Sequence, residues 1–83
     1  MLAKIYVTPK KSVLDPQGKA VAAGLHALGY GAVGDVRVGK YLEVSLDAPD
    51  APTAMEMAKT MCERLLANTV IEEYRIEIGE AAR

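Results

Sequence analysis

The sequence predicts an α+β domain whose elements follow the order β-α-β-β-α-β. Three observations predict this order. Apolar residues alternate with polar ones near both ends and in the middle of the chain, two stretches between these segments have helical spacing, and glycine or proline stands at the junctions. The chain has 83 residues, a length typical of one domain, so we expect residues 1–83 to fold as a single unit.

The first strand is expected over residues 2–8. Ala3, Ile5 and Val7 share one face at a spacing of two residues, as in a strand that lays one face against a core. The opposite face carries Leu2, Lys4, Tyr6 and Thr8.

The first helix is expected after a basic loop over residues 9–14. Asp15 can accept hydrogen bonds from the free amides of the helix start, and Pro16 suits the first helical position. Gly18 is unusual there, because glycine costs up to ~1 kcal/mol relative to alanine in a helix. Either another backbone approaches it closely, or the helix end tolerates it. Gly29 is placed to end the helix. Its apolar stripe consists of Val21, Leu25 and Leu28.

Two strands are expected within residues 33–46, with a turn near Gly39. A two-residue turn would place Val38 opposite Tyr41 and mix the two faces of the sheet. A three-residue turn would place Val38 opposite Leu42. Two explanations therefore stand: the turn is bulged, or both faces of the sheet are partly buried.

The second helix is expected after a proline-containing loop over residues 47–52. Thr53 and Glu56 have the spacing of a capping box, and Asp50 is an alternative cap. Asn68 closes this helix. Its apolar stripe consists of Ala54, Ala58, Met61 and Leu65.

The last strand is expected over residues 70–78, with Tyr74, Ile76 and Ile78 facing inward, and the tail over residues 79–83 is expected to be frayed. Helical crossovers then bring the strands into one sheet. The expected product is a four-stranded antiparallel sheet with two helices on one face, the two-layer ferredoxin-like plan, and its other face is open.

The charge and cysteine content argue against several classes of function. Eleven acidic and ten basic side chains leave a net charge of −1, which offers no long-range attraction to nucleic acid or to an anionic membrane. The single cysteine, Cys62, permits no intrachain disulfide and suits a reducing compartment. No signal peptide or membrane-spanning run is visible, so a soluble cytoplasmic protein is expected.

Two glycine-rich patterns match nucleotide-binding motifs but lack their structural setting. Residues 29–34 match G-x-G-x-x-G, yet a helix precedes them and a strand follows, the reverse of the required order. Residues 34–40 match G-x-x-x-x-G-K, but Tyr41 stands where Ser or Thr would hold magnesium. We therefore expect no cofactor-binding residues.

No catalytic or metal-binding constellation is visible either. His26 is the only histidine and has no second ligand type beside it. Cys62 has no base nearby in the pattern and is expected to be a small buried apolar residue. Glu72 and Glu73 are adjacent on a strand and point to opposite faces. The polar residues left unexplained by packing lie at the turns.

Those turn residues belong to segments that resemble the PurS family in order and spacing. The segments are residues 13–18 (VLDPQG), 28–29 (LG), 36–40 (VRVGK), 65–68 (LLAN) and 70–72 (VIE). The likeness extends over nearly the whole chain. The departures lie in loops, at Lys11, Ser12 and Thr69.

The resemblance implies a non-catalytic subunit of phosphoribosylformylglycinamidine synthase, an enzyme of purine biosynthesis. In that family the small subunit has no active site of its own and bridges a glutaminase subunit and a larger ATP-dependent synthetase subunit. It forms a homodimer or a dimer of dimers. The complex is a ligase that uses ATP and magnesium and takes ammonia from glutamine, whereas this subunit is implied to bind no cofactor.

Two surfaces follow from the resemblance as hypotheses. The turn residues are expected to contact the large subunits, and Arg37 offers a two-pronged donor for a partner carboxylate. These residues are Asp15, Gln17, Gly18, Arg37, Gly39 and Lys40. The open sheet face is expected to mediate self-association, which a domain burying only ~60–65% of its unfolded surface favours. Its residues are Leu2, Tyr6 and Tyr41.

Three alternatives share the predicted strand order. An RNA-binding domain would display aromatic residues on its third strand, where this chain offers only Tyr41. An acylphosphatase-like enzyme would need an arginine near the first loop, which here carries Lys10 and Lys11. A ligand-sensing domain stays open on the sequence alone.

Overall fold

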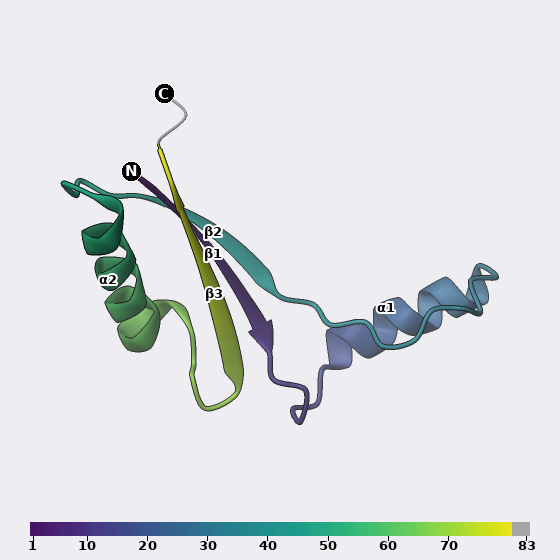
Figure 1. The fold of residues 1–83 in the computed structure, drawn as a ribbon. Helices are drawn as coiled ribbons and strands as arrows, with labels where there is room; N and C mark the ends of the chain where they lie inside the picture. The colour runs from purple at the N-terminus through teal and green to yellow at the C-terminus, as the bar shows by residue number, and fades with distance from the viewer. Residues whose placement is uncertain (81–83) are drawn as a thin grey trace.

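The computed structural model describes residues 1–80, and its elements alternate between strands and helices (Figure 1). In chain order they are β1 (Leu2–Pro9), α1 (Pro16–Ala27), β2 (Lys40–Ser45), α2 (Ala51–Met61), the π-helical turn η1 (Cys62–Leu66) and β3 (Glu72–Gly79). The architecture is therefore α+β, with two helices and three strands among the described residues. No helix of this part of the chain has the length and apolarity needed to cross a membrane.

The three strands form one antiparallel sheet in the order β2-β1-β3. The central strand β1 places Ile5 opposite Leu42 on one side and opposite Ile76 on the other. Tyr6 lies opposite Tyr41 and Arg75 in the same way. The predicted alternation of β1 is confirmed, since its three inward residues are buried and those between them are not.

Within residues 1–80 the predicted fourth strand does not form. Residues 33–38 are extended but pair with no strand, and the backbone runs on into β2 without reversing at Gly39. The physical reason lies at Gly39, where a Cβ atom would stand 2.3 Å from the carbonyl oxygen of Val7. The backbone there is pressed against the end of β1 and continues along it, so both versions of the predicted hairpin turn are wrong.

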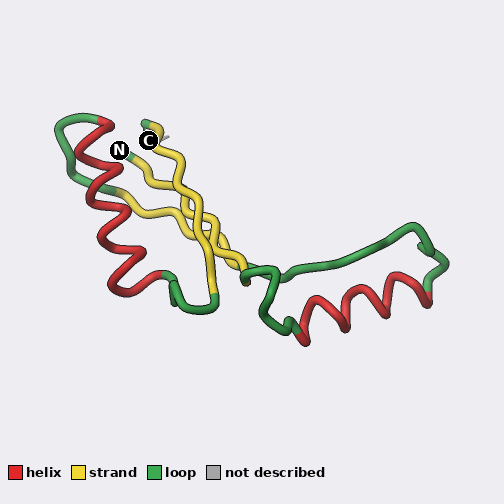
Figure 2. The backbone as a smooth tube through the Cα atoms, turned by 60° about the horizontal axis from the view of Figure 1, so that its bottom comes forward, coloured by secondary structure: helices red, strands yellow, loops and turns green. Residues whose placement is uncertain are grey.

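Helix α1 also departs from the expected arrangement, because it projects away from the sheet instead of covering it (Figures 1 and 2). Only α2 packs on the sheet, over β3 and β1. The radius of gyration is 16.0 Å, whereas a compact domain of this length has about 12 Å. We call residues 16–38, which run out along α1 and back to the sheet, the arm.

The core lies between α2 and the inner face of the sheet. Ala58 and Cys62 from the helical side meet Ala3, Ile5 and Val7 from β1, and all five are buried. The prediction that Cys62 is a small buried apolar residue is confirmed. Partly buried side chains surround this cluster, among them Leu42, Val44, Leu46, Leu66 and Ile76.

The second helix confirms the alternative cap at its start and departs from the prediction near its end. Its cap is Asp50, whose carboxylate accepts a 2.8 Å hydrogen bond from the amide of Thr53, so the helix begins before the expected capping box. Near its other end the hydrogen bonding widens to a π-helical turn over Cys62–Leu66. This change leaves Leu65 82% exposed and turns Leu66 towards the core, so the prediction for Leu65 is wrong.

The end of the chain is ordered further than expected. Gly79 belongs to β3 and lies opposite Leu2, so the prediction of fraying is wrong at that residue. Glu80 follows the strand without regular structure, and the rest of that prediction, for residues 81–83, lies outside the described residues.

Candidate interaction site at the base of the arm

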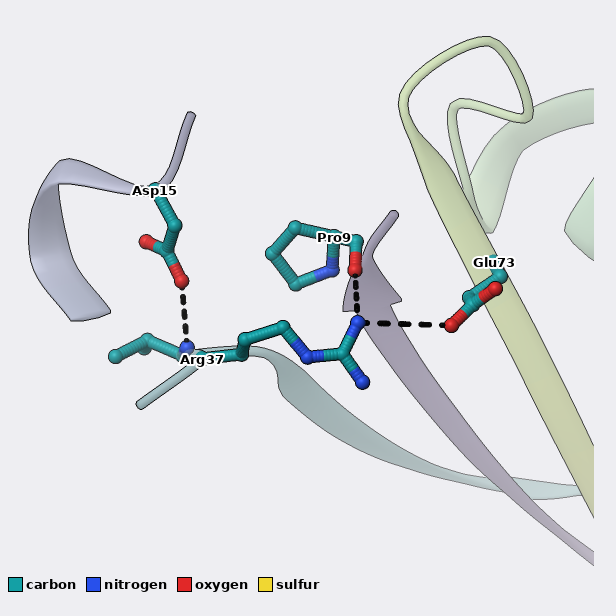
Figure 3. Close-up of polar contacts among 5 residues, drawn as sticks. Pro9, Asp15, Arg37 and Glu73 are labelled. Atoms are coloured by element: carbon teal, nitrogen blue, oxygen red, sulfur yellow. Dashed lines mark hydrogen bonds and ion pairs between the residues drawn. The ribbon is translucent and has the colours of Figure 1, made fainter. Parts of the chain in front are cut away.

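Two of the segments that carry the family resemblance, residues 13–18 and 36–40, meet where the arm joins the sheet. Asp15 lies at the start of α1, and its carboxylate binds two parts of the arm, of which Figure 3 shows the segment that returns to the sheet. Oδ1 accepts a 3.0 Å hydrogen bond from the amide of Gly18, and Oδ2 accepts a 2.8 Å bond from the amide of Val38. The predicted cap is thus confirmed, and the same side chain also links the start of the helix to the part of the arm that returns to the sheet. We call that part, residues 33–38, the returning chain. These backbone hydrogen bonds, from Gly18 first and Val38 second, lower the pKa of Asp15.

Gly18 allows the helix and the returning chain to touch. A Cβ atom at this position would lie 2.0 Å from the carbonyl oxygen of Val36, well inside any permitted contact. Gly18 is also the one buried residue of α1. Of the two explanations for a glycine early in a helix, the close approach of another backbone is therefore the one the structure supports.

Arg37 fastens the returning chain to the ends of two strands. Its Nη1 donates a 2.6 Å hydrogen bond to the carbonyl oxygen of Pro9 at the end of β1. The same nitrogen lies 3.6 Å from a carboxylate oxygen of Glu73 at the start of β3 (Figure 3). Because both partners are partly exposed, the ion pair adds modestly to stability, and the hydrogen bond to Pro9 fixes the position of the side chain.

A cavity of about 440 Å³ opens beside these contacts. Basic side chains dominate its polar lining, with three cationic groups against two carboxylates. The lining residues are Lys11, Val13, Leu14, Asp15, Lys19, Asp35, Val36 and Arg37. Within residues 1–80 no three side chains of the metal-binding types gather into a possible metal site.

The predicted turn residues thus fall into two groups. Asp15, Gly18, Arg37 and Gly39 come together at the base of the arm and make contacts within the chain. Gln17 and Lys40 are exposed beside them.

The residues predicted for self-association lie on the sheet face opposite α2. The rings of Tyr6 and Tyr41 are 5.0 Å apart between centroids, and the guanidinium of Arg75 stands 4.1 Å above the ring of Tyr6. The hydroxyl of Tyr6 donates to Glu77, and that of Tyr41 donates to Glu43, which raises the pKa of Tyr41 to about 12. Leu2 lies farther along the same face, opposite Ser45. This face is a polar and aromatic network rather than an apolar patch.

Comparison with known proteins identifies the family to which this chain is similar. The family model described as PurS, phosphoribosylformylglycinamidine (FGAM) synthase, matches residues 2–80. Subunit PurS of phosphoribosylformylglycinamidine synthase from Synechocystis is 59% identical over 75 residues, which cover 90% of this chain and 75% of that protein. The chain belongs to the PurS family.

Solved structures of PurS proteins share the fold. PurS of Methanocaldococcus jannaschii, one of the subunits of formylglycinamide ribonucleotide amidotransferase in the purine biosynthetic pathway, superposes with a TM-score of 0.85 at 30% identity. The match covers 96% of each chain. A chain in the structure of PurLQS from Thermotoga maritima matches with a TM-score of 0.80 at 32% identity, over 93% of this chain and 96% of that one. The resemblance inferred from the turn segments is confirmed.

Two members of the site at the base of the arm were not predicted from the sequence, namely the carbonyl of Pro9 and the side chain of Glu73. The acceptor at Pro9 is a backbone carbonyl, which no residue type identifies. One feature of the sequence pointed indirectly to Glu73. The alternation of the last strand places it on the outward face with Arg75 and Glu77. Its proximity to Arg37 depends on the course of the arm, which the local pattern does not determine.

Proposed function

We propose that this chain is the small adaptor subunit of phosphoribosylformylglycinamidine synthase in purine biosynthesis, acting in the cytoplasm. The observation that carries the proposal is the match of the PurS family model to residues 2–80. In this role the chain bridges a glutaminase subunit and a larger synthetase subunit, and the assembled ligase uses ATP and magnesium. The adaptor itself contributes no reacting group.

The contribution of an adaptor to such a reaction is positional. Ammonia released from glutamine has to reach a second active site before it is protonated or lost to solvent. A subunit that holds the two active sites together replaces a chance encounter by a fixed geometry, which is an entropic gain in rate. The contacts of Asp15 and Arg37 within the chain support this role, because they hold the arm in one orientation to the sheet.

The exposed members of the turn segments are the proposed contacts with the larger subunits. Gln17 and Lys40 are exposed, and neither side chain is needed for the contacts that hold the arm. Arg37, by contrast, already binds Pro9 and Glu73 through Nη1. We also propose that the chain self-associates as a homodimer or a dimer of dimers.

Reconstitution tests the adaptor proposal. The chain is mixed with the glutaminase and synthetase subunits from the same source, and amidine formation is measured with glutamine or with ammonia. We expect glutamine-dependent activity only when this chain is present, and ammonia-dependent activity with the synthetase alone. Equal glutamine-dependent activity without the chain would rule out the adaptor role.

A double variant tests the proposed contact surface. Gln17→Ala with Lys40→Ala is expected to lower glutamine-dependent turnover by ~10-fold or more at limiting adaptor, since losing ~1.4 kcal/mol of binding is tenfold in affinity. The ammonia-dependent rate and the thermal midpoint of the isolated chain should not change, because both side chains are exposed. Unchanged glutamine-dependent turnover would remove these residues from the interface.

A further inference from the structure

The cavity at the base of the arm is lined by basic side chains that have no acidic partner. Three of its lining residues are basic and come from separate segments: Lys11 from the loop after β1, Lys19 from the first turn of α1 and Arg37 from the returning chain. Among residues 1–80, neither Lys11 nor Lys19 forms an ion pair with a carboxylate. Two ammonium groups at the cavity are therefore unpaired in this part of the chain.

Arg37 has donors that its contacts within the chain do not use. Its hydrogen bond to Pro9 and its ion pair with Glu73 both run through Nη1. Nη2 lies on the side of the guanidinium turned away from Pro9 (Figure 3), and neither Nη2 nor Nε makes a hydrogen bond within the described chain. A guanidinium that is fixed at one nitrogen and open at the others presents donors to an anion from a defined position.

The two carboxylates of the cavity do not offset this positive charge. Both oxygens of Asp15 accept hydrogen bonds from backbone amides, those of Gly18 and Val38, so its charge is already stabilised at the helix start. Asp35 is exposed and forms no ion pair with the residues that the structure describes. The cavity thus has an excess of positive charge, although the net charge of the whole chain is −1. An anion in the cavity would reduce the repulsion among its cations.

The rest of the cavity wall is aliphatic. Val13 and Val36 are partly buried there, and Leu14 is 68% exposed. The volume of about 440 Å³ lies within the range of ~300–1,000 Å³ found for small-molecule sites, which combine apolar walls with a few polar groups. A single carboxylate from another protein would leave most of this volume and the side chain of Leu14 to water. The cavity therefore fits a small molecule that has an organic body as well as a charged group.

We propose that this cavity binds a small phosphorylated compound, a phosphomonoester carried on a ring of the size of a sugar. The phosphate lies between Lys11, Lys19 and Arg37. The ring packs on Leu14 and Val36. A phosphomonoester has three terminal oxygens and a charge of about −1.5 to −2, so it matches three cationic groups from separate segments better than a carboxylate does. This binding site goes beyond the adaptor role and does not depend on it.

The walls of the cavity are held in place by contacts within the chain. The carboxylate of Asp15 binds Val38, and Gly18 lies against Val36, so the helix start and the returning chain keep a fixed separation. The hydrogen bond from Arg37 to Pro9 fixes the basic side of the cavity to the sheet. A site that is formed before the ligand arrives loses less of its interaction energy to ordering.

Titration of the full chain, followed by amide-resolved NMR, tests the site. The probe is glucose 6-phosphate, and inorganic phosphate and glucose represent its two halves. We expect the largest shifts at the amides of residues 11–19 and 35–37, with a dissociation constant on the order of 1 mM at low salt, because the site is partly open to water. Glucose should cause no shifts there. Inorganic phosphate should bind ~4-fold or more weakly, the effect of losing at least one buried CH2 group.

Charge variants distinguish the cavity from a general attraction of the protein for anions. Lys11→Gln and Lys19→Gln are each expected to weaken the binding of glucose 6-phosphate by ~3–5-fold, the effect of one exposed charge pair. Asp35→Asn should tighten it by ~2–5-fold, because it removes the unpaired carboxylate of the cavity. Lys59→Gln is the matched control, since it removes an exposed lysine of α2 outside the cavity and should leave binding unchanged. All four side chains are exposed, so the thermal midpoints should stay close to that of the wild type.

Several results would overturn the proposal. An absence of shifts at residues 11–19 and 35–37 would exclude the site, and an equal loss of binding in Lys59→Gln would show attraction by net charge alone. Inorganic phosphate that binds as tightly as glucose 6-phosphate would contradict the packing of the ring. A peptide of six glutamates that binds through Lys11 and Lys19, where glucose 6-phosphate does not, would assign the cavity to an acidic segment of another protein. None of these results bears on the adaptor role, which reconstitution measures.

Discussion

At the scale of single residues, Gly18 is the position with the least room. Replacing glycine by alanine inside a helix ordinarily stabilises it by up to ~1 kcal/mol. At Gly18 the new Cβ would stand 2.0 Å from the Val36 carbonyl oxygen, so the helix and the returning chain have to separate. We expect Gly18→Ala to lower the free energy of unfolding by ~1–3 kcal/mol, the usual cost of overpacking, measured by urea denaturation.

Gly24 provides the matched control in the same helix. Nothing lies within 4 Å of the Cβ position at Gly24, and that residue is exposed. Gly24→Ala should therefore stabilise the protein by as much as ~1 kcal/mol, in the opposite direction to Gly18→Ala. Equal effects of the two substitutions would mean that the contact with Val36 does not constrain the arm.

Asp15 gives the arm a dependence on pH. Its pKa is lowered in the folded protein from an ordinary value of 3.8, so its contribution is fully present above that value and is lost as the pH falls through the lower, folded-state pKa. Asn at this position keeps one acceptor but turns an N–H group towards the second amide. We expect Asp15→Asn to lower the urea midpoint at pH 7, and the difference from wild type to shrink at pH 3. A difference that is the same at both pH values would show that the charge of the carboxylate is not involved.

Half of the role of Asp15 was predictable from its own neighbourhood. The Asp-Pro pair indicates a helix start, and the hydrogen bond to Gly18 spans three residues. The bond to Val38 spans 23 residues and depends on where the arm returns, which no local pattern determines. Local chemistry therefore identified residues of the site, and only the fold showed that Asp15, Gly18, Arg37 and Gly39 come together at the base of the arm.

At the scale of elements, the π-helical turn decides which leucine supports the core. Leu66 packs against the buried cluster, whereas Leu65 is exposed. We expect Leu66→Ala to cost ~1–2 kcal/mol, below the ~2–5 kcal/mol of a fully buried leucine, because this side chain is only partly buried. Leu65→Ala in the isolated protein should stay within ~0.5 kcal/mol of wild type. Thermal denaturation of the two variants measures the difference. If Leu65→Ala were the more destabilising of the two, Leu65 rather than Leu66 would face the core, as continuous α-helical spacing predicts.

The elements themselves followed from periodicity, and their partners did not. Strands β1 and β3 alternate strictly because one face of each meets the core, so residues such as Ile5 and Ile76 marked them in the sequence. Residues 33–38 alternate as well, yet they pair with none of the strands that the structure describes. An alternating pattern indicates that a segment can form a strand. It does not identify the strand with which that segment pairs.

At the scale of the whole molecule, the projecting arm bears on the self-association proposed above. Val21 and Leu28 of α1 are exposed in a single copy, and β2 is an edge strand of the sheet. In the proposed homodimer unfolding includes dissociation, so we expect the thermal midpoint to rise with protein concentration. For two chains that unfold together, a 100-fold increase in concentration adds ~2.7 kcal/mol, which raises Tm by roughly 5–10 °C. Differential scanning calorimetry over that range measures the shift. A wild-type Tm independent of concentration would mean that the arm is stable without a second copy.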